Sequence, residues 1–164
     1  MYFSLIDKID ELIPGESIVA TKSLAMSEEY LRDHFPKFPV MPGVLMLEAM
    51  TQASAWLIRV TENFANSIVV LKETKNVKFG QFLQPGQTLV VTSKIVSDSE
   101  NETVVKVQGA MEGQVRIRAQ LTLAKYNLCD VSGSQAHFDP KLIKTLKNEL
   151  ALLWKDIPLE LIDE

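Results

Sequence analysis

The sequence predicts a single α+β domain in which a curved antiparallel β-sheet wraps around one long helix. Residues 44–62 are apolar on nearly every face of a helix, which is typical of a buried helix rather than a surface one. β-Branched and alternating segments then dominate residues 67–124, as in antiparallel strands. The chain has 164 residues, 46% of them hydrophobic, which suits one sizeable core.

The N-terminal quarter of the chain predicts three short elements. Residues 2–9 have the apolar character of a strand or a short helix, and residues 14–15 (Pro-Gly) form a turn. Residues 17–24 are a predicted strand. Residues 27–31 predict a short helix, with Ser27 as its N-cap.

A proline-rich loop and the long helix follow. Pro36, Pro39 and Pro42 each fix their own backbone and restrict the preceding residue, so this loop should be stiff. Pro42 also suits the first turn of a helix, where its missing N–H costs nothing. The buried helix should therefore run from Val44 to about Glu62.

Five strands are predicted after the helix, at residues 67–71, 76–82, 87–96, 103–111 and 115–124. Turn signals separate them, and Glu112-Gly113 suits a tight hairpin between the last two. One buried helix followed by a run of antiparallel strands is the order that predicts the α+β fold.

The chain divides near residue 126. Residues 1–126 form the predicted α+β domain, and residues 127–164 add a linker (127–138) and an amphipathic helix. Asp139 is a predicted N-cap, with Pro140 at the first helical position. Apolar residues at helical spacing predict a helix of about 15 residues. They are Leu142, Leu146, Leu150, Leu153 and Ile157.

Composition excludes several classes of protein. The formal charge is −4 and Lys and Arg are scattered, whereas nucleic-acid binding requires a basic stripe. The one cysteine, Cys129, cannot form an internal disulfide, and a reducing cytoplasm is the simplest setting. We expect no secretory leader and no membrane helix, because no basic start precedes an apolar run and no apolar stretch reaches ~18 residues.

Glu48 is a carboxylate within the otherwise apolar helix, and Gln52 follows one turn later on the same face. A helical glutamate usually points into solvent or forms a salt bridge, and that interpretation stays open. Because the surrounding helix is apolar, an inward carboxylate is about equally favoured. Burial would help Glu48 to hold a proton near neutrality, as a general acid must.

His34 and Gly43 lie at the two ends of the proline-rich loop. A lone histidine is usually structural, and we interpret His137, in the polar linker, in that way. Gly43 is either a turn glycine or an oxyanion donor, since backbone N–H groups at a helix start polarise a carbonyl oxygen. With His34 as a base, Glu48 as an acid and Gly43 as an oxyanion donor, the set would suit proton abstraction next to a carbonyl.

No metal or cofactor is expected. One cysteine and two widely spaced histidines do not supply a zinc site. The sequence also lacks the glycine-rich patterns that bind dinucleotides or phosphates, and a nucleophile elbow.

The run from residue 34 to residue 52 resembles the 3-hydroxyacyl-(acyl-carrier-protein) dehydratases, a family of hotdog-fold enzymes. The matching residues are His34-Phe35-Pro36, Pro39, Met41-Pro42-Gly43-Val44-Leu45, Glu48-Ala49-Met50 and Gln52. A second match comprises Val77-Lys78-Phe79, Pro85-Gly86 and Leu89. The resemblance covers roughly residues 2–126.

The resemblance implies a hotdog fold, a long central helix wrapped by a curved antiparallel sheet. It implies a homodimer that also assembles into hexamers as trimers of dimers, with His34 of one subunit facing Glu48 of the other. His34 would abstract the C2 proton of a (3R)-3-hydroxyacyl thioester, and Glu48 would assist loss of the hydroxyl as water. The Gly43 amide would bind the thioester oxygen. The product would be a trans-2-enoyl thioester in fatty-acid or related lipid or polyketide synthesis.

A narrow apolar tunnel for the acyl chain is also expected. Val44, Met46, Gln52, Phe79 and Phe82 are the candidates to line it, although each apolar one suits a core position equally well. The acyl group would arrive on acyl carrier protein or on CoA.

The chain departs from the family pattern at two places. Asp33 replaces the usual glycine before His34, and a carboxylate there would favour the protonated form of the base and weaken it. Residues 80–81 (Gly-Gln) replace a basic stretch, leaving only Lys78, which predicts weaker steering of an acidic carrier protein.

Other functions stay open at this point. An acyl-CoA hydratase or a thioesterase would keep the fold and change the reaction, and a weakly active acyl-binding subunit would keep only binding. The C-terminal helix is expected to pack on the sheet or on a subunit interface, with partner docking or closure of the tunnel as the less favoured roles.

Overall fold

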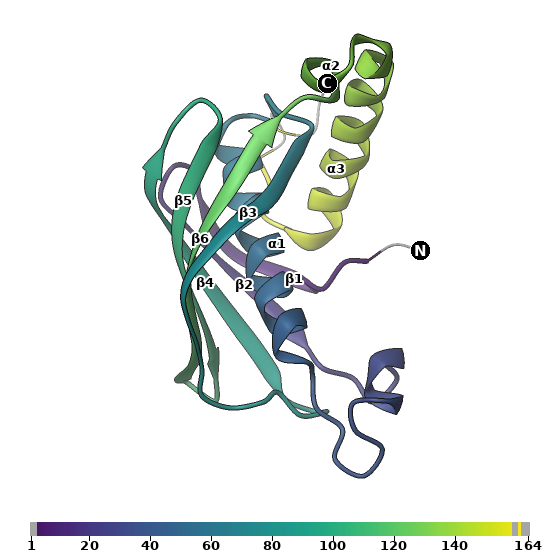
Figure 1. Cartoon of the computed structure of the whole chain (residues 1–164), viewed down its shortest axis with the longest axis vertical. Coiled ribbons are helices and arrows are strands. Elements are labelled where there is room, and N and C mark those ends of the chain that lie inside the picture. Colours follow the sequence, from purple (N-terminus) through teal and green to yellow (C-terminus); the bar gives the residue numbers. More distant parts are fainter. Residues whose placement is uncertain (1–2, 159–160, 162–164) are drawn as a thin grey trace.

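The computed structural model describes residues 3–158 and 161, and one antiparallel sheet dominates it (Figure 1). Its strands are β1 (Lys8–Ile13), β2 (Ser17–Ser23), β3 (Ile68–Phe79), β4 (Thr88–Asp98), β5 (Glu102–Met111) and β6 (Gln114–Tyr126). They are ordered β1-β2-β4-β5-β6-β3, so β1 and β3 are the two edges. Residues 1–2 of the predicted domain (1–126) lie outside the described residues. So do residues 159–160 and 162–164 of the predicted C-terminal segment (127–164).

The long helix α1 (Gly43–Thr61) lies in the concave face of the sheet. It buries Met50, Ala53 and Leu57 completely, and the inward residues of the strands complete the same core. The side chains of β2 and β5 alternate between this core and the outer face, as the pleat requires. The structure therefore confirms the predicted α+β architecture. Among the described residues, no helix is both long and apolar enough to cross a membrane.

The first predicted element is shifted along the chain. Residues 3–7 belong to no helix or strand, and β1 begins only near the end of the predicted range 2–9 and continues beyond it. Leu5 and Ile6 are nevertheless buried, which accounts for the apolar pattern in this region.

The short helix before the proline-rich loop is also shifted. It is a 3-10 helix, η1 (Glu29–Arg32), and Ser27 does not cap it. Glu28 precedes the helix in extended conformation, because its carboxylate binds the buried Lys22 ammonium at 2.5 Å. The prediction of Ser27 as N-cap is therefore wrong, since a tertiary ion pair sets the start of the helix.

The strands predicted at 67–71 and 76–82 form the single strand β3, and Phe82 lies beyond its end. The register with β6 shifts twice along β3, and Asn76 has a φ of 54°. Such bulges bend a strand without ending its pairing. The prediction of two strands fails because the bulged middle of β3 lacks an alternating apolar pattern.

The predicted linker also contains structure, namely a short helix α2 (Leu128–Val131) and a 3-10 helix η2 (Gly133–Phe138). The final helix, α3 (Asp139–Leu153), has 15 residues, as predicted, but it ends before Ile157, the last residue of the predicted apolar pattern. It lies on the side of α1 that the sheet leaves uncovered (Figure 1). Leu150 and Leu153 join the main core, so α3 is an integral layer of the described domain.

The prediction that Asp139 caps α3 is wrong. Its side chain binds groups outside that helix. Its carboxylate accepts hydrogen bonds from the Ser67 hydroxyl and from the amides of Leu128, at 2.8 Å, and Cys129, at 3.0 Å. The N-cap position of α3 is taken by Phe138. Asp139 thus fastens α2 and α3 to the segment that leads into β3.

This contact predicts an acid-sensitive attachment of the C-terminal helices. The Ser67 hydrogen bond, with the two backbone amides, holds the pKa of Asp139 below its usual 3.8. The contact therefore stabilises the fold above pH 3.8 and is lost as the pH falls through the lower folded value. We expect hydrogen exchange in α2 and α3 to accelerate in that range, and Asp139→Asn to show faster exchange already at neutral pH. Equal exchange in the variant and the wild type at neutral pH would contradict this role.

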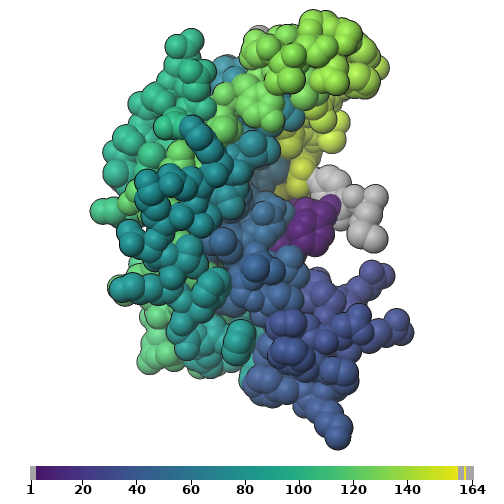
Figure 2. Space-filling view, viewed as in Figure 1, coloured from purple at the N-terminus to yellow at the C-terminus, as the bar shows by residue number. Residues whose placement is uncertain are grey.

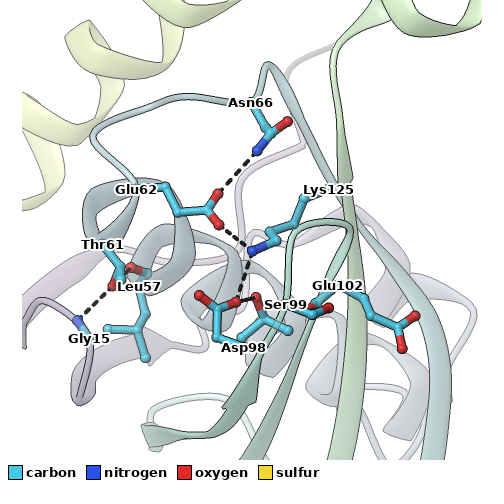
Figure 3. A network of polar contacts seen from close by, with 10 residues as sticks. Gly15, Leu57, Thr61, Glu62, Asn66, Asp98, Ser99, Glu102 and Lys125 are labelled. Atoms are coloured by element: carbon cyan, nitrogen blue, oxygen red, sulfur yellow. Dashed lines mark hydrogen bonds and ion pairs between the residues drawn. The ribbon is translucent and has the colours of Figure 1, made fainter.

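An ion-pair network around one buried lysine fastens the far end of α1 to the sheet (Figure 3). The Lys125 side chain, on β6, is 1% exposed and contacts the carboxylates of Glu62, after α1, and Asp98, at the end of β4. Burial alone would raise the pKa of Asp98, but hydrogen bonds from Lys125 and Thr103 outweigh it and lower the value. The three charges join one helix and two strands at the same point.

Removing this cation should destabilise the whole domain. Lys125→Met keeps the aliphatic stem but leaves two neighbouring carboxylates uncompensated, so we expect a loss of about 2–3 kcal/mol in the free energy of unfolding. Urea denaturation followed by circular dichroism measures this. Lys72→Met is the matched control, because Lys72 pairs with Glu102 at 2.5 Å in the open and is 58% exposed. Equal losses in the two variants would contradict the assigned role of the network.

Candidate active site

The loop between η1 and α1 holds His34 rigidly. The His34 amide donates to the Tyr30 carbonyl at 3.2 Å, and the His34 carbonyl accepts from the Val40 amide at 2.9 Å. The imidazole is half-buried, and its Nδ1 lies 3.0 Å from the Val40 carbonyl oxygen. The ring stacks on Phe35, with 4.3 Å between the ring centroids. The backbone and the ring of His34 are thus both held within one closed loop.

The Val40 carbonyl selects the tautomer of His34. A carbonyl oxygen can only accept a hydrogen bond, so Nδ1 must carry the proton. In the neutral ring Nε2 then keeps its lone pair and can take a proton from a substrate. Asp33, whose side chain is exposed, forms no hydrogen bond with His34 among the described residues. This geometry is the one that a general base would need.

The start of α1 places the Gly43 amide ahead of the first hydrogen bonds of the helix. The Leu45 amide, at 2.9 Å, and the Met46 amide, at 3.2 Å, both bond to the Pro42 carbonyl. The Gly43 amide precedes these first helical donors and lies at the positive end of a 19-residue helix. Pro42 is the N-cap residue rather than the first helical one.

Gly43 also packs closely against a side chain of β3. A Cβ atom at this position would lie 3.0 Å from Cε1 of Phe79 and 3.4 Å from its Cζ. The aromatic ring therefore packs directly against the glycine backbone, beside the amide that would meet a carbonyl oxygen.

Gly43→Ala should impair the site more than the fold. The added methyl would push the Phe79 ring aside by a few tenths of an ångström, and that ring is half exposed and free to turn. We expect kcat/KM for the 3-hydroxyacyl thioester that the resemblance implies to fall about tenfold to a hundredfold, with a small change in melting temperature. Gly133→Ala is the control, because a Cβ there meets nothing within 4 Å. Unchanged turnover in Gly43→Ala would contradict the role of this amide.

Glu48 is positioned by Gln52, one turn further along α1. The Gln52 amide nitrogen donates to Oε1 of Glu48 at 2.9 Å and to the Phe3 carbonyl at 3.2 Å. Its Oε1 accepts from the Leu5 amide at 2.8 Å. Gln52 therefore joins the carboxylate to the first residues of the described chain, and its contacts are polar rather than those of an apolar tunnel wall.

Glu48 and Gln52 share a groove of about 410 Å³ with side chains of α1, β3 and α3. Figure 2 shows the purple start of the chain lying between the blue surface of α1 and the yellow end of α3. Arg59 lies further along the groove, 5.2 Å from the centre of the Trp56 ring, and burial lowers its pKa to about 10 against the pull of Glu149. His34 is not among the residues that line this groove. Within one chain, the candidate base and acid therefore occupy separate surroundings.

The predicted tunnel residues divide into two groups. Val44 is 71% exposed, and Phe79 and Phe82 are each 51% exposed. Met46 is completely buried and packs in the core between α1 and the sheet, which is the alternative that its apolar character left open. The exposed three all lie near the start of α1, because the Met41 amide bonds to the Leu83 carbonyl at 2.8 Å and draws the two loops together.

Sequence reasoning missed two contributors to this site. The Val40 carbonyl has no signature, because any residue supplies one, and only the closed loop brings it to His34. Arg59 stands on the same helix as Glu48 but was not singled out, although a cation in an apolar helix is a signal of the same kind. Among the residues that the model describes, no three His, Cys, Asp or Glu side chains are grouped as a metal site would need.

Comparison with known families matches residues 1–120 to the FabA-like domain. The 3-hydroxyacyl-(acyl-carrier-protein) dehydratase FabZ of Lactobacillus helveticus is 40% identical over 116 residues, covering 71% of this chain and 78% of the relative. The enzyme of the same name from Pediococcus pentosaceus is 41% identical over 117 residues, covering 71% and 78%. That from Ruminiclostridium cellulolyticum is 33% identical over 122 residues, covering 74% and 86%.

Solved structures share the fold at lower identity. A chain of the dehydratase heterocomplex ApeI:P from Xenorhabdus doucetiae superposes with a TM-score of 0.59 at 18% identity, covering 75% of this chain and 99% of its own length. The protein smu.793 from Streptococcus mutans, bound to acetyl CoA, gives a TM-score of 0.58 at 16% identity, covering 76% and 91%. These likenesses establish the hotdog fold.

Proposed function

Because this chain belongs to the FabA-like domain family, we propose that it dehydrates (3R)-3-hydroxyacyl thioesters of acyl carrier protein to trans-2-enoyl thioesters, a step of fatty-acid synthesis. One observation in the site itself supports the proposal in addition to the family match. The Val40 carbonyl holds the proton of His34 on Nδ1 and leaves Nε2 as a base beside the start of the helix that carries Glu48. The lone cysteine, Cys129, which is exposed, makes the cytoplasm the compartment we infer.

In the proposed reaction, His34 Nε2 takes the proton from C2 of the substrate. The negative charge that develops on the thioester oxygen is held by the Gly43 amide at the positive end of α1. The electron pair of the broken C2–H bond, held in the enolate, forms the C2–C3 double bond as the C3–O bond breaks. The hydroxyl leaves with the C3–O electron pair and takes a proton from Glu48, which makes it water. No group outside the chain and its substrate is needed to balance these steps.

We propose that a second copy of the chain completes each site, with His34 of one subunit facing Glu48 of the partner subunit. The separate surroundings of the two residues within one chain support this arrangement. The edge strand β3 also supports it. Among the described strands β3 pairs only with β6, and a second copy would cover its other edge together with the partly exposed Val70 and Leu71. Dimers of this kind would stack further into a trimer of dimers.

A direct turnover assay tests the proposed reaction. Short 3-hydroxyacyl thioesters of carrier protein and of CoA are offered to the wild-type protein, and enoyl thioester and free thiol are measured in parallel. We expect enoyl product without thiol release, and faster turnover on the carrier. Thiol release would indicate a thioesterase, preference for CoA would indicate a hydratase of CoA esters, and tight binding without turnover would indicate an acyl-binding subunit. Each of these results would overturn the proposal.

A further inference from the structure

We propose that the outer face of the sheet, the face turned away from α1, is the docking surface for the acidic carrier protein; this inference rests on the proposed function. A hollow of about 850 Å³ lies there, across β3, β4, β5 and β6. Four cations line it and no carboxylate does: Lys78, Lys94, Lys106 and Arg118. We call this set the basic hollow. The charge of this hollow is therefore positive, whereas the net charge of the whole chain is −4.

The strand register sets these cations opposite one another. Lys94 on β4 pairs directly with Lys106 on β5, and Lys78 on β3 pairs with Arg118 on β6. Like charges placed directly opposite on a sheet destabilise it. The arrangement is therefore unfavourable for the isolated domain, and it becomes favourable when an anion binds over the outer face between the opposed cations.

None of the four cations forms an ion pair within the part of the chain that the model describes. Other lysines of the same sheet do have partners, since Lys72 binds Glu102 at 2.5 Å and Lys75 binds Glu73 at 3.0 Å. The cations of the basic hollow are thus the ones left available to a ligand.

The shape of the hollow favours an acidic helix over a small anion. It is open and spans four strands, a width of roughly 14 Å at the usual strand spacing, which accommodates a helix about 10 Å across. Neutral donors (Thr92, Gln108) and an exposed aliphatic side chain (Val96) lie among the cations, as at a protein interface. A second copy of this chain does not fit, because two such faces would repel each other.

The hollow and the proposed site share the end of β3, on opposite faces of the sheet. Lys78 precedes Phe79 on β3, so the two side chains point to opposite faces, and the Phe79 ring packs on Gly43. The acyl arm of a carrier bound to the outer face would reach the start of α1 by passing the end of β3 at Phe79, rather than the strand edge that the second copy covers. The sequence hides this surface because its four cations are far apart in the chain and only the register brings them together.

Charge reversal tests the docking surface. We expect Lys94→Glu and Lys106→Glu to raise KM for a carrier-borne substrate about tenfold or more, to leave KM for the CoA thioester within about twofold, and to flatten the salt dependence. Each single reversal pairs with the lysine opposite, so the melting temperature should not fall. Lys144→Glu, on the exposed side of α3, is the matched control and should change neither KM.

Two results would overturn the docking proposal. One is an unchanged KM for the carrier substrate in both variants, and the other is an equal rise for the CoA thioester, which would mark a site for a small phosphate ligand. Binding of the holo-carrier protein to the wild type and to Lys94→Glu, measured by titration calorimetry, gives a readout without turnover. Loss of binding in the variant would support docking even if the wild type failed to dehydrate any thioester.

Discussion

Replacing His34 by alanine is expected to lower kcat for dehydration about a thousandfold while the protein stays folded. The imidazole is half-buried and contributes one side-chain hydrogen bond, to the Val40 carbonyl, so its loss should cost little stability. It is, however, the only group at the start of α1 to which we assign removal of the C2 proton. Steady-state turnover on a 3-hydroxyacyl carrier substrate, with circular dichroism as the check on folding, measures both effects.

His137 provides a close internal control. Its Nδ1 lies 3.1 Å from the Ser134 carbonyl and its ring packs on Phe138, with 4.0 Å between centroids, so it repeats the local arrangement of His34 outside the site. We expect His137→Ala to keep wild-type turnover. Equal losses in the two alanine variants, or full activity in His34→Ala, would refute His34 as the base.

Replacing Glu48 by glutamine is the second large effect. Glutamine has the same shape and can keep the contact with Gln52, which lies 2.9 Å from the carboxylate, but it cannot deliver a proton to the departing hydroxyl. We expect kcat to fall about a hundredfold to a thousandfold, with KM and melting temperature nearly unchanged. The same assay with substrate at saturation separates kcat from KM.

Glu149→Gln is the control for Glu48→Gln, because Glu149 lines the same groove from α3. It removes one negative charge from the groove but none from the proposed reaction. Turnover within about threefold of the wild type is expected, since an electrostatic effect of one neighbouring charge is small. A loss as large as that of Glu48→Gln would show that groove charge, rather than proton delivery, matters.

Much of this architecture is encoded locally and could be predicted from the sequence. The buried helix is visible from its all-round apolar character, and the hairpin at Glu112-Gly113 from its turn residues, both of which adopt positive φ. The errors fall where tertiary contacts override local pattern. Lys22 draws Glu28 out of the predicted helix start, and Asp139 binds α2 rather than capping α3.

The features of the site likewise divide into those that the sequence predicts and those that depend on tertiary contacts. The positions of His34, Gly43 and Glu48 could be predicted because a proline-rich loop, a helix start and an isolated carboxylate each leave a mark on the sequence. The tautomer of His34 could not, because it depends on loop closure onto Val40. The basic hollow could not either, because it depends on the register of four strands.

The central claim, that two copies of the chain share each site, is tested by mixing two inactive variants. His34→Ala and Glu48→Gln are co-expressed in equal amounts, so that half of the dimers contain one of each. In each mixed dimer one site carries both substitutions and the other carries neither, and we expect about one quarter of wild-type turnover. Turnover no higher than that of the separate variants would place both residues in a site within one chain and contradict the shared arrangement.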